Sequence, residues 1–213
     1  MSALRVLVGL GNPGPEHTGQ RHNAGFWLVD ALVQAHAGSL RSDRKLHGEC
    51  ARVSVGDQEL LLLKPDTFMN RSGRCVQAAA AYFKVPVTDI LIAHDELDLP
   101  PGTVRLKRGG GNGGHNGLRD ITSHLGADFA RIRLGIGHPG HKSQVLNYVL
   151  GRPSSTEEAQ IRDGIAEVVS ALPLILDHWD KAAQKLHTAG APAADNGNKP
   201  VRTSTKEAGN SES

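Results

Sequence analysis

The chain has 213 residues, 38% of them hydrophobic and only 4% aromatic, and its formal net charge is +2. This composition fits one domain with a core of Leu, Val, Ile and Ala, and the weak positive charge permits an anionic partner without requiring one. Two cysteines without a C-x-x-C spacing argue against a disulfide framework or a zinc site. Neither an apolar run of 18 residues nor a signal-peptide pattern is present, so we expect a cytoplasmic protein without a membrane segment.

The N-terminal stretch predicts a strand, a polar loop and a buried helix. Alternating valines favour a buried strand over residues 4–10, and an apolar pattern that begins at the candidate cap Asn23 predicts a helix over 23–36. Open α/β sheets bind ligands at the carboxyl ends of their strands, where this loop carries Asn12 and His22. An imidazole is the commonest general base near neutral pH, so both residues are candidates for a site.

The same stretch matches the G-x-G-x-x-G dinucleotide fingerprint through three glycines: Gly9, Gly11 and Gly14. In that fingerprint a helix begins inside the glycine run and holds a pyrophosphate at its N-terminus. Here Pro13 and Pro15 flank the last glycine, so no helix is expected before about Asn23. The fingerprint also expects an acidic residue about 20 positions farther on, at the end of a second strand, and the nearest candidate, Asp30, lies within the predicted helix. A nucleotide-cofactor-binding oxidoreductase is therefore an alternative that rests on the glycines alone.

The rest of the chain alternates predicted strands and helices. The expected strands cover residues 49–55, 59–64, 89–94, 103–108 and 130–137. The expected helices cover residues 72–84, 118–125, 155–172 and 174–187. Gly56-Asp57 predicts a hairpin turn, Ser155 and Glu158 a capping box, and Pro173 a break between the last two helices.

This order of elements predicts a single-domain α/β fold with three layers. Interleaved strands and helices favour a sheet between helices, and the hairpins require antiparallel pairs, so we expect a central mixed β-sheet flanked by helices. The folded domain is expected over residues 1–187. Residues 188–213 contain almost no apolar side chains, and we expect them to form a disordered C-terminal tail.

Asp95 directly follows a short apolar strand, at the same kind of position as Asn12. A single carboxylate there can orient a histidine that acts as a base, and we expect this role for it. The alternatives are an ordinary solvent-facing carboxylate or a cation site shared with Glu96 and Asp98. Because alternate residues of a strand point to opposite faces, and no histidine-rich spacing supports a metal, we expect none.

Two further stretches place polar side chains before predicted helices. Asn70 precedes a helix, where it serves either as a cap or as a site residue. His115 and Asn116 interrupt a glycine-rich run over residues 109–117, immediately before the next helix. Such a run is either a flexible loop or a frame that presents backbone N–H groups to an anion.

Basic side chains alternate along two predicted strands: Arg105, Lys107, Arg108, Arg131 and Arg133. They form either a solvated face or, if the two strands lie on the same side of the molecule, a stripe that can bind phosphates. The spacing alone leaves both interpretations open.

Six segments of the chain, in this order, resemble the bacterial-type peptidyl-tRNA hydrolase family: 8–14, 21–25, 64–73, 94–98, 109–117 and 133–140. The resemblance covers residues 4–186. It implies a monomeric α/β enzyme without a cofactor. It also implies hydrolysis of the ester that joins a nascent peptide to the 3′ ribose of tRNA, which recycles peptidyl-tRNA lost from stalled translation. A protein that binds tRNA without chemistry would not need Asp95 and His22 together.

The resemblance also implies roles for individual residues. His22 would accept a proton, Asp95 would hold its basic form, and Asn12 would sense that the amino group is acylated. A further set would contact the tRNA and the peptide: His17, Phe68, Met69, Asn70, His115, Asn116, Lys107 and Arg133. Two positions depart from the family pattern, since His17 replaces a usual tyrosine and Gln20 a usual threonine. Any tRNA contact at position 17 is therefore made by an imidazole here.

Overall fold

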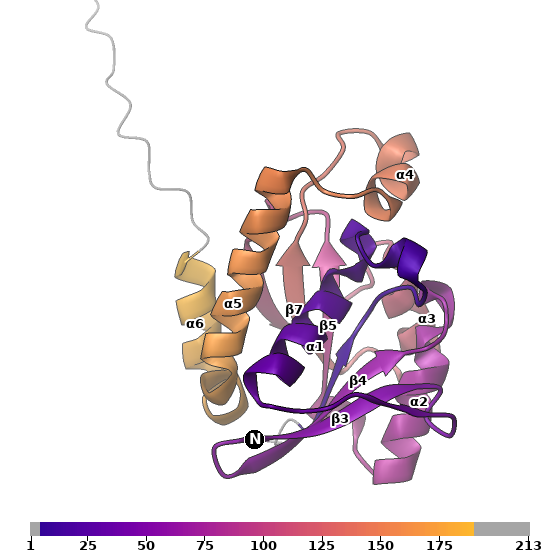
Figure 1. Cartoon of the computed structure of the whole chain (residues 1–213), viewed down its shortest axis with the longest axis vertical. Coiled ribbons are helices and arrows are strands. Elements are labelled where there is room, and N and C mark those ends of the chain that lie inside the picture. The colour runs from indigo at the N-terminus through magenta and orange to yellow at the C-terminus, as the bar shows by residue number, and fades with distance from the viewer. Residues whose placement is uncertain (1–4, 190–213) are drawn as a thin grey trace, which may run out of the picture.

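A mixed sheet between two helical layers forms the centre of the protein, which we describe from a computed structural model over residues 5–189 (Figure 1). The seven strands lie in the order β2-β3-β4-β1-β5-β7-β6. Four central strands run parallel: β4 (Gln58–Pro65), β1 (Val6–Gly9), β5 (Ile90–Glu96) and β7 (Ala130–Gly135). Antiparallel strands complete both edges: β2 (Arg41–Asp43), β3 (Gly48–Val55) and β6 (Val104–Arg108).

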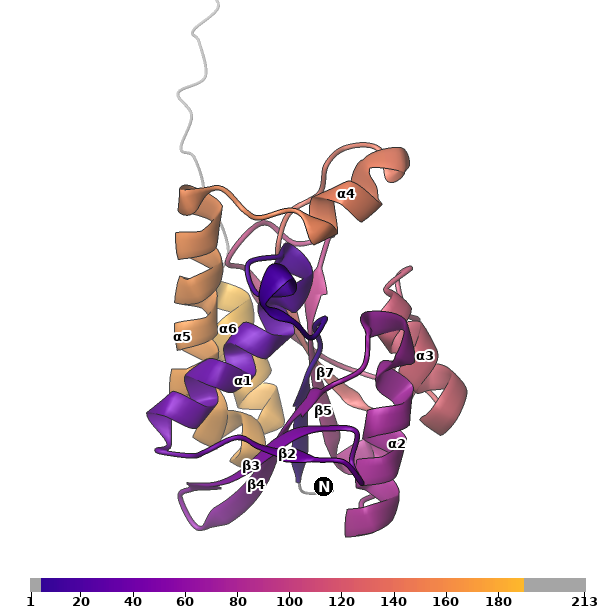
Figure 2. The same ribbon diagram turned by 45° about the vertical axis from the view of Figure 1, so that its right-hand side comes forward.

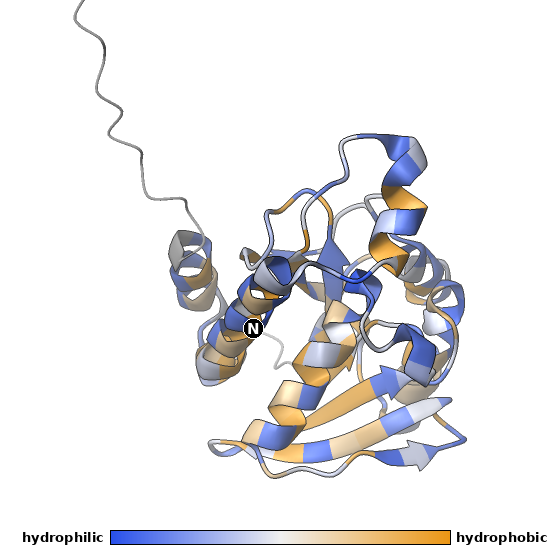
Figure 3. Ribbon diagram, turned by 45° about the horizontal axis from the view of Figure 1, so that its top comes forward, coloured by the Kyte–Doolittle hydropathy of each residue, from blue (hydrophilic) through white to orange (hydrophobic). Residues whose placement is uncertain are grey.

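The two faces of the sheet are covered by different helices (Figure 2). One face packs against α1 (Ala24–Ala35), α5 (Ser155–Asp177) and α6 (Trp179–Ala189). The other face packs against α2 (Ser72–Phe83) and α3 (Asn116–Leu125). Apolar strand residues alternate between the two cores, and hydrophobic residues occur on strands and helices alike (Figure 3). The expected three-layer fold with a mixed sheet is confirmed.

A short helix, α4 (Val145–Leu150), lies above the carboxyl ends of the parallel strands, at the top of Figure 2. The sequence did not predict it, nor the edge strand β2. Among residues 5–189, no helix has both the length and the hydrophobicity that crossing a membrane requires. The expected disordered tail lies outside the described residues except at its first two positions, where α6 continues to Ala189.

Two predictions about the C-terminal helices are wrong. Helix α5 passes through Pro173 and ends at Asp177, because its buried face continues across the proline, for example at Leu172 and Ile175. The capping box also lies one residue earlier than expected: the hydroxyl of Ser154 accepts from the backbone of Glu157, whose side chain accepts from the backbone of Ser154.

Gly9 of the dinucleotide fingerprint is used for close packing together with Gly25. A Cβ at Gly9 would clash with the carbonyl of Gly25 in α1, and a Cβ at Gly25 would clash with the carbonyl of Ala93 in β5. The first turn of α1 therefore lies directly against β1 and β5. Two single turns of 3₁₀ helix, Pro15–His17 and Arg21–Asn23, follow the glycines where no helix was expected, but α1 begins only at Ala24 and contains Asp30 as expected. The structure gives no support to a nucleotide cofactor.

Candidate active site

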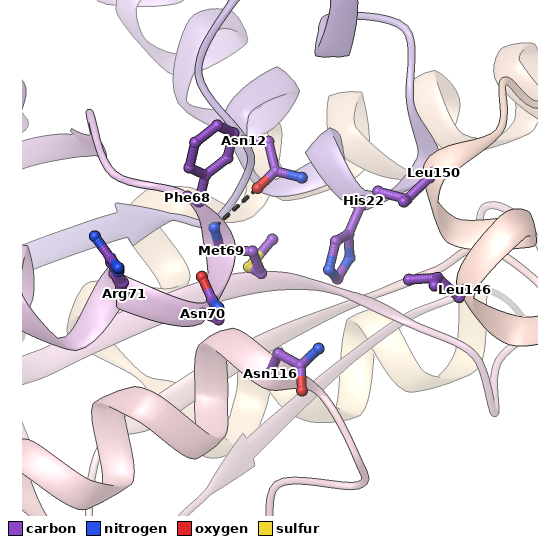
Figure 4. Close-up of a pocket in the computed structure, with 9 residues that line it drawn as sticks. All are labelled: Asn12, His22, Phe68, Met69, Asn70, Arg71, Asn116, Leu146 and Leu150. Atoms are coloured by element: carbon purple, nitrogen blue, oxygen red, sulfur yellow. Dashed lines mark hydrogen bonds between the residues drawn. The ribbon is translucent and has the colours of Figure 1, made fainter.

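A pocket of about 510 Å³ opens at the carboxyl ends of the parallel strands, beside α4, whose Leu146 and Leu150 lie at the right of Figure 4. Its lining comes from the loops after β1 and β4, from the start of α3 and from α4: Asn12, His22, Phe68, Met69, Asn70, Arg71, Asn116, Leu146 and Leu150. The order of the strands changes direction around β1, which is where open α/β sheets form ligand crevices.

Asn12 is held rigidly in the floor of this pocket. Its backbone N–H donates to Oδ1 of Asn23 and its carbonyl accepts from Nδ2 of Asn23, both at 2.9 Å. Its side-chain Oδ1 accepts from the backbone N–H of Met69 at 2.8 Å, which leaves the amide nitrogen on the side of His22 (Figure 4). Asn23 was expected to cap α1, but its side chain makes no cap hydrogen bond and positions Asn12 instead.

His22 and Asp95 form a buried pair, as the sequence predicted. Nδ1 of His22 lies 2.9 Å from both carboxylate oxygens of Asp95. Asp95 is 3% exposed and His22 is 8% exposed. Because a carboxylate accepts, Nδ1 carries the proton and Nε2 holds the free lone pair of the neutral ring. No described residue forms a hydrogen bond with Nε2, and the ring lines the pocket.

The environment favours opposite charges on the two partners. Burial opposes a charge on His22, but the negative charge and hydrogen bond of Asp95 outweigh it and raise the pKa of His22 above 6.5. Burial also opposes ionisation of Asp95, but two neighbouring histidines, His22 and His115, outweigh it and hold the pKa of Asp95 well below its ordinary value. The carboxylate is therefore a fixed negative charge beside the imidazole at neutral pH.

The exposed rim of the pocket combines free amides with apolar side chains. The side chains of Asn70 and Asn116 make no hydrogen bond with residues 5–189, and both line the pocket. Phe68 on one side and Leu146 and Leu150 on the other are among the few large hydrophobic residues exposed to solvent in the described chain. Both leucines belong to α4. Because the sequence did not predict this helix, it did not predict these two lining residues either.

Four residues expected to bind substrate do not line the pocket. His17 stands behind Phe68, with ring centroids 6.1 Å apart. The His115 ring lies beneath the pocket, with Nε2 3.0 Å from Oδ1 of Asp95. Lys107 and Arg133 lie farther away, on the strands β6 and β7.

The basic stripe is assembled, but most of its charges are already engaged. Arg105 pairs in register with Arg133, and Lys107 pairs with Arg131, so the two strands are neighbours as the stripe required. Arg131 is buried and donates to the carbonyls of the glycine-rich run. Arg133 lies 2.8 Å from Glu96. Lys107 and Arg108 are the exposed members of this stripe, and the guanidinium of Arg108 lies over the ring of Trp179 at 4.4 Å.

Arg21, the residue before His22, was not predicted as a site residue. Its guanidinium donates to the carbonyls of Tyr148 and Arg152 at 3.2 and 2.9 Å and to the carboxylate of Glu157 at 3.0 Å. It also stacks over the Tyr148 ring at 4.0 Å. The chain beside His22 is thereby tied to α4 and to the start of α5.

One atom each of His22, Asp95 and His115 that could bind a metal ion lies within 4.8 Å of the other two. Among residues 5–189 this is the only cluster of three such residues. A cation there would have to replace the protons that the two imidazoles donate to Asp95. Glu96 pairs with Arg133, so the cation site considered from the sequence, at Asp95, Glu96 and Asp98, is not assembled. The absence of a metal from the reaction stays a prediction.

A mixed-sheet α/β fold with an imidazole–carboxylate pair in an amide-lined pocket fits an enzyme that uses general acid–base chemistry, such as a hydrolase. Comparisons with known proteins identify which one. The sequence model of the family described as Peptidyl-tRNA hydrolase matches residues 6–194. The Peptidyl-tRNA hydrolase of Halorhodospira halophila is 56% identical over 86% of this chain and 96% of its own length, and that of Chromohalobacter salexigens is 50% identical over 90% and 100%.

Solved structures agree. A crystal structure of peptidyl-tRNA hydrolase from Acinetobacter baumannii superposes with a TM-score of 0.85 at 44% identity, covering 88% of this chain and 96% of that one. A structure of a peptidyl-tRNA hydrolase complex with N-propanol gives a TM-score of 0.87 at 44% identity, over 91% and 98%. The chain belongs to the peptidyl-tRNA hydrolase family and is an enzyme that acts on peptidyl-tRNA.

Proposed function

We propose that neutral His22 is the general base that activates water for attack on the ester of peptidyl-tRNA. The observation that carries this proposal is the pair at 2.9 Å between Nδ1 of His22 and Asp95, which leaves Nε2 free on the pocket side. Asp95 holds the ring in the tautomer that can accept a proton and stabilises the imidazolium that forms. A base of this kind contributes roughly 10²–10⁴-fold to the rate.

Water is the proposed nucleophile because the lining offers no other. None of the nine lining residues carries a hydroxyl or a thiol. Nε2 takes one proton from water, the resulting hydroxide adds to the ester carbonyl, and the bond to the ribose oxygen then breaks. The imidazolium returns its proton to that oxygen, so the step balances without a cofactor, and we propose that none is needed.

The amides of the pocket are proposed to read the substrate. Asn12 presents an NH₂ group beside His22, where it can recognise an acylated amino group and so spare ordinary aminoacyl-tRNA. Asn70 and Asn116 have donors and acceptors to spare, so they can bind the peptide backbone or the 3′ end of the tRNA. Phe68 and Met69 supply apolar contacts for the same groups.

Contacts farther from the ester are proposed to bind the tRNA body. Lys107 and Arg133 would contact phosphates, with Arg133 exchanging part of its pairing with Glu96. His17 would support Phe68 against the 3′ end, and His115 is considered separately below. We also propose that the enzyme works as a monomer in the cytoplasm.

The test is turnover of an N-acetylated aminoacyl-tRNA by His22→Ala. We expect kcat to fall at least about a hundredfold, while tRNA binding stays close to wild type because its proposed phosphate contacts lie elsewhere. Turnover near the wild-type rate would contradict the proposal, and so would wild-type activity that EDTA abolishes and added divalent metal restores. Asn12→Ala should mainly reduce the preference for the N-acetylated over the unblocked substrate.

A further inference from the structure

The carboxylate of Asp95 is held by two neighbouring imidazoles, whose ring centroids lie 5.0 Å apart. His22 contributes Nδ1 at 2.9 Å, and His115 contributes Nε2 at 3.0 Å from Oδ1. The side chains of Asp95 and His115 are almost completely buried. The account of His22 as a base explains only the first of these contacts, so the second needs a function of its own.

The start of α3 fixes the protonation of His115. Nδ1 of His115 accepts from the backbone N–H groups of Gly117 and Leu118, at 3.2 and 3.3 Å. Backbone N–H groups can only donate, so Nδ1 must be unprotonated and Nε2 must carry the proton. These contacts also use the first free N–H groups of α3, which are therefore not available to an anion.

A third histidine supports this arrangement from behind. His94 packs edge-on against His115 with ring centroids 5.1 Å apart, and its Nδ1 donates to the backbone carbonyl of Asp95 at 2.8 Å. Burial lowers the pKa of His94 to about 3, so it is neutral under working conditions. The charged and titratable groups around the carboxylate are thus His22 before α1, His94 on β5, His115 before α3 and, beyond His94, Arg131 on β7.

We propose that His115 is a positioning residue that fixes the orientation of Asp95 and limits how strongly Asp95 raises the basicity of His22. A hydrogen bond to a carboxylate stabilises its negative charge and reduces its attraction for another proton. Without His115, Asp95 would hold a proton on His22 more tightly, and more of the base would be protonated and inactive at neutral pH. This inference rests on the proposed role of His22 as the base.

Two substitutions separate this function from capping of α3. His115→Asn keeps a side-chain oxygen suited to the cap but cannot reach Asp95. His115→Gln places an amide nitrogen about as far out as Nε2 and can restore the donor. For His115→Asn we expect a melting temperature near that of wild type, an acid limb of kcat/KM displaced to higher pH by about one unit, and little change in KM. His115→Gln should return the limb toward its wild-type position.

The pKa of His22, read from its ring resonances by NMR, should move in the same direction in the full-length variant even if turnover is low. An unchanged pKa and acid limb in His115→Asn would overturn the proposal. A raised KM with the pH profile intact would instead assign His115 to substrate binding and also contradict it. Failure of the proposed base is distinguishable, because then His22→Ala would keep its activity whatever His115 does.

Discussion

The floor and the rim of the pocket are built in different ways. In the floor, Asn12, His22 and Asp95 are at most 8% exposed, and each is fixed by hydrogen bonds to neighbouring residues. On the rim, Phe68 is 57% exposed and Leu146 is 64% exposed, and the amides of Asn70 and Asn116 have no partner among residues 5–189.

Apart from Asn12, which is also proposed to recognise the substrate, this difference separates the residues of the chemistry from those of recognition. Floor side chains have lost their conformational freedom before substrate arrives, so their geometry is ready for the reaction and costs nothing at that moment. Rim side chains keep their freedom and their solvation until substrate binds. We therefore expect changes in the floor to lower kcat and most changes on the rim to act on KM.

The largest effect is expected for Asp95→Asn. The new amide can donate to Nδ1 of His22, which would place the ring proton on Nε2 and leave the base unable to accept another. We expect a loss of about 10³–10⁴-fold in kcat on N-acetylated aminoacyl-tRNA, with tRNA binding retained. Asp98→Asn, at an exposed position three residues away, is the matched control. If kcat fell less than tenfold in a folded Asp95→Asn protein, the assignment of the chemistry to the floor of the pocket would be refuted.

Asn70→Ala and Asn116→Ala test whether the rim takes part in chemistry. If one of these amides donates to the oxyanion, its loss should cost about 3 kcal/mol of barrier, roughly a hundredfold in kcat. We expect this for at least one of them in steady-state assays. Gln77→Ala, an exposed amide on α2, serves as the control. If both variants change only KM, the floor alone performs the chemistry and the rim serves only to bind substrate.

The deepest layer of the floor should make stability depend on pH. The pKa of His94 is about 3 in the folded protein and near 6.5 when unfolded, so the unfolded state binds the extra proton. The contribution of His94 to the free energy of unfolding should therefore fall by about 1.4 kcal/mol for each pH unit between pH 6.5 and 4.5. The lowered pKa of His187 acts in the same direction. The raised pKa of His22 removes stability only above pH 6.5, and the lowered pKa of Asp95 only below about pH 4, so neither affects this window.

Urea unfolding of His94→Gln at several pH values checks this origin. The dependence of the free energy of unfolding on pH should weaken by the equivalent of about one proton in His94→Gln. His141→Gln, at an exposed loop position, should keep the wild-type dependence. Equal slopes in wild type and His94→Gln would show that the buried layer is not responsible.

The smallest effect is expected far from the ester, at Lys107. Lys107→Glu should raise KM a few-fold for full tRNA, and the dependence of binding on salt should weaken by about one phosphate contact. Arg133→Gln should act in the same direction. A minimal N-acetyl-aminoacyl-adenosine substrate lacks those phosphates, so its kcat/KM should stay near wild type. Equal damage to both substrates would place these side chains within the pocket.

Local patterns were sufficient to predict most of the floor. The hairpin of β3 and β4, the strand that ends before Asn12 and the loop that carries His22 all follow from apolar periodicity and turn residues. The strand before Asp95 was predicted to end at His94, but β5 continues to Glu96 and includes Asp95. The contact between Asp95 and His22 was expected, because each residue lies near the carboxyl end of a parallel strand and these ends meet at the same end of the sheet.

The sequence patterns did not predict features that depend on contacts between separate parts of the chain. Asn23 has the composition of a helix cap, and only the return of the chain beside Asn12 gives it another partner. Pro173 is a helix breaker by propensity, but the packed face of α5 overrides that preference. The contact between His115 and Asp95 joins residues 20 positions apart through the packing of α3 on the sheet, which no sequence spacing specifies.

The most direct test of the central claim compares two titrations of the wild-type enzyme. The first follows the His22 ring by NMR, and the second follows the acid limb of kcat/KM for N-acetylated aminoacyl-tRNA. If neutral His22 is the base, both should give the same pKa, above the ordinary value of 6.5 because of Asp95. An acid limb that does not coincide with the titration of His22, or that persists in His22→Ala, would contradict the account.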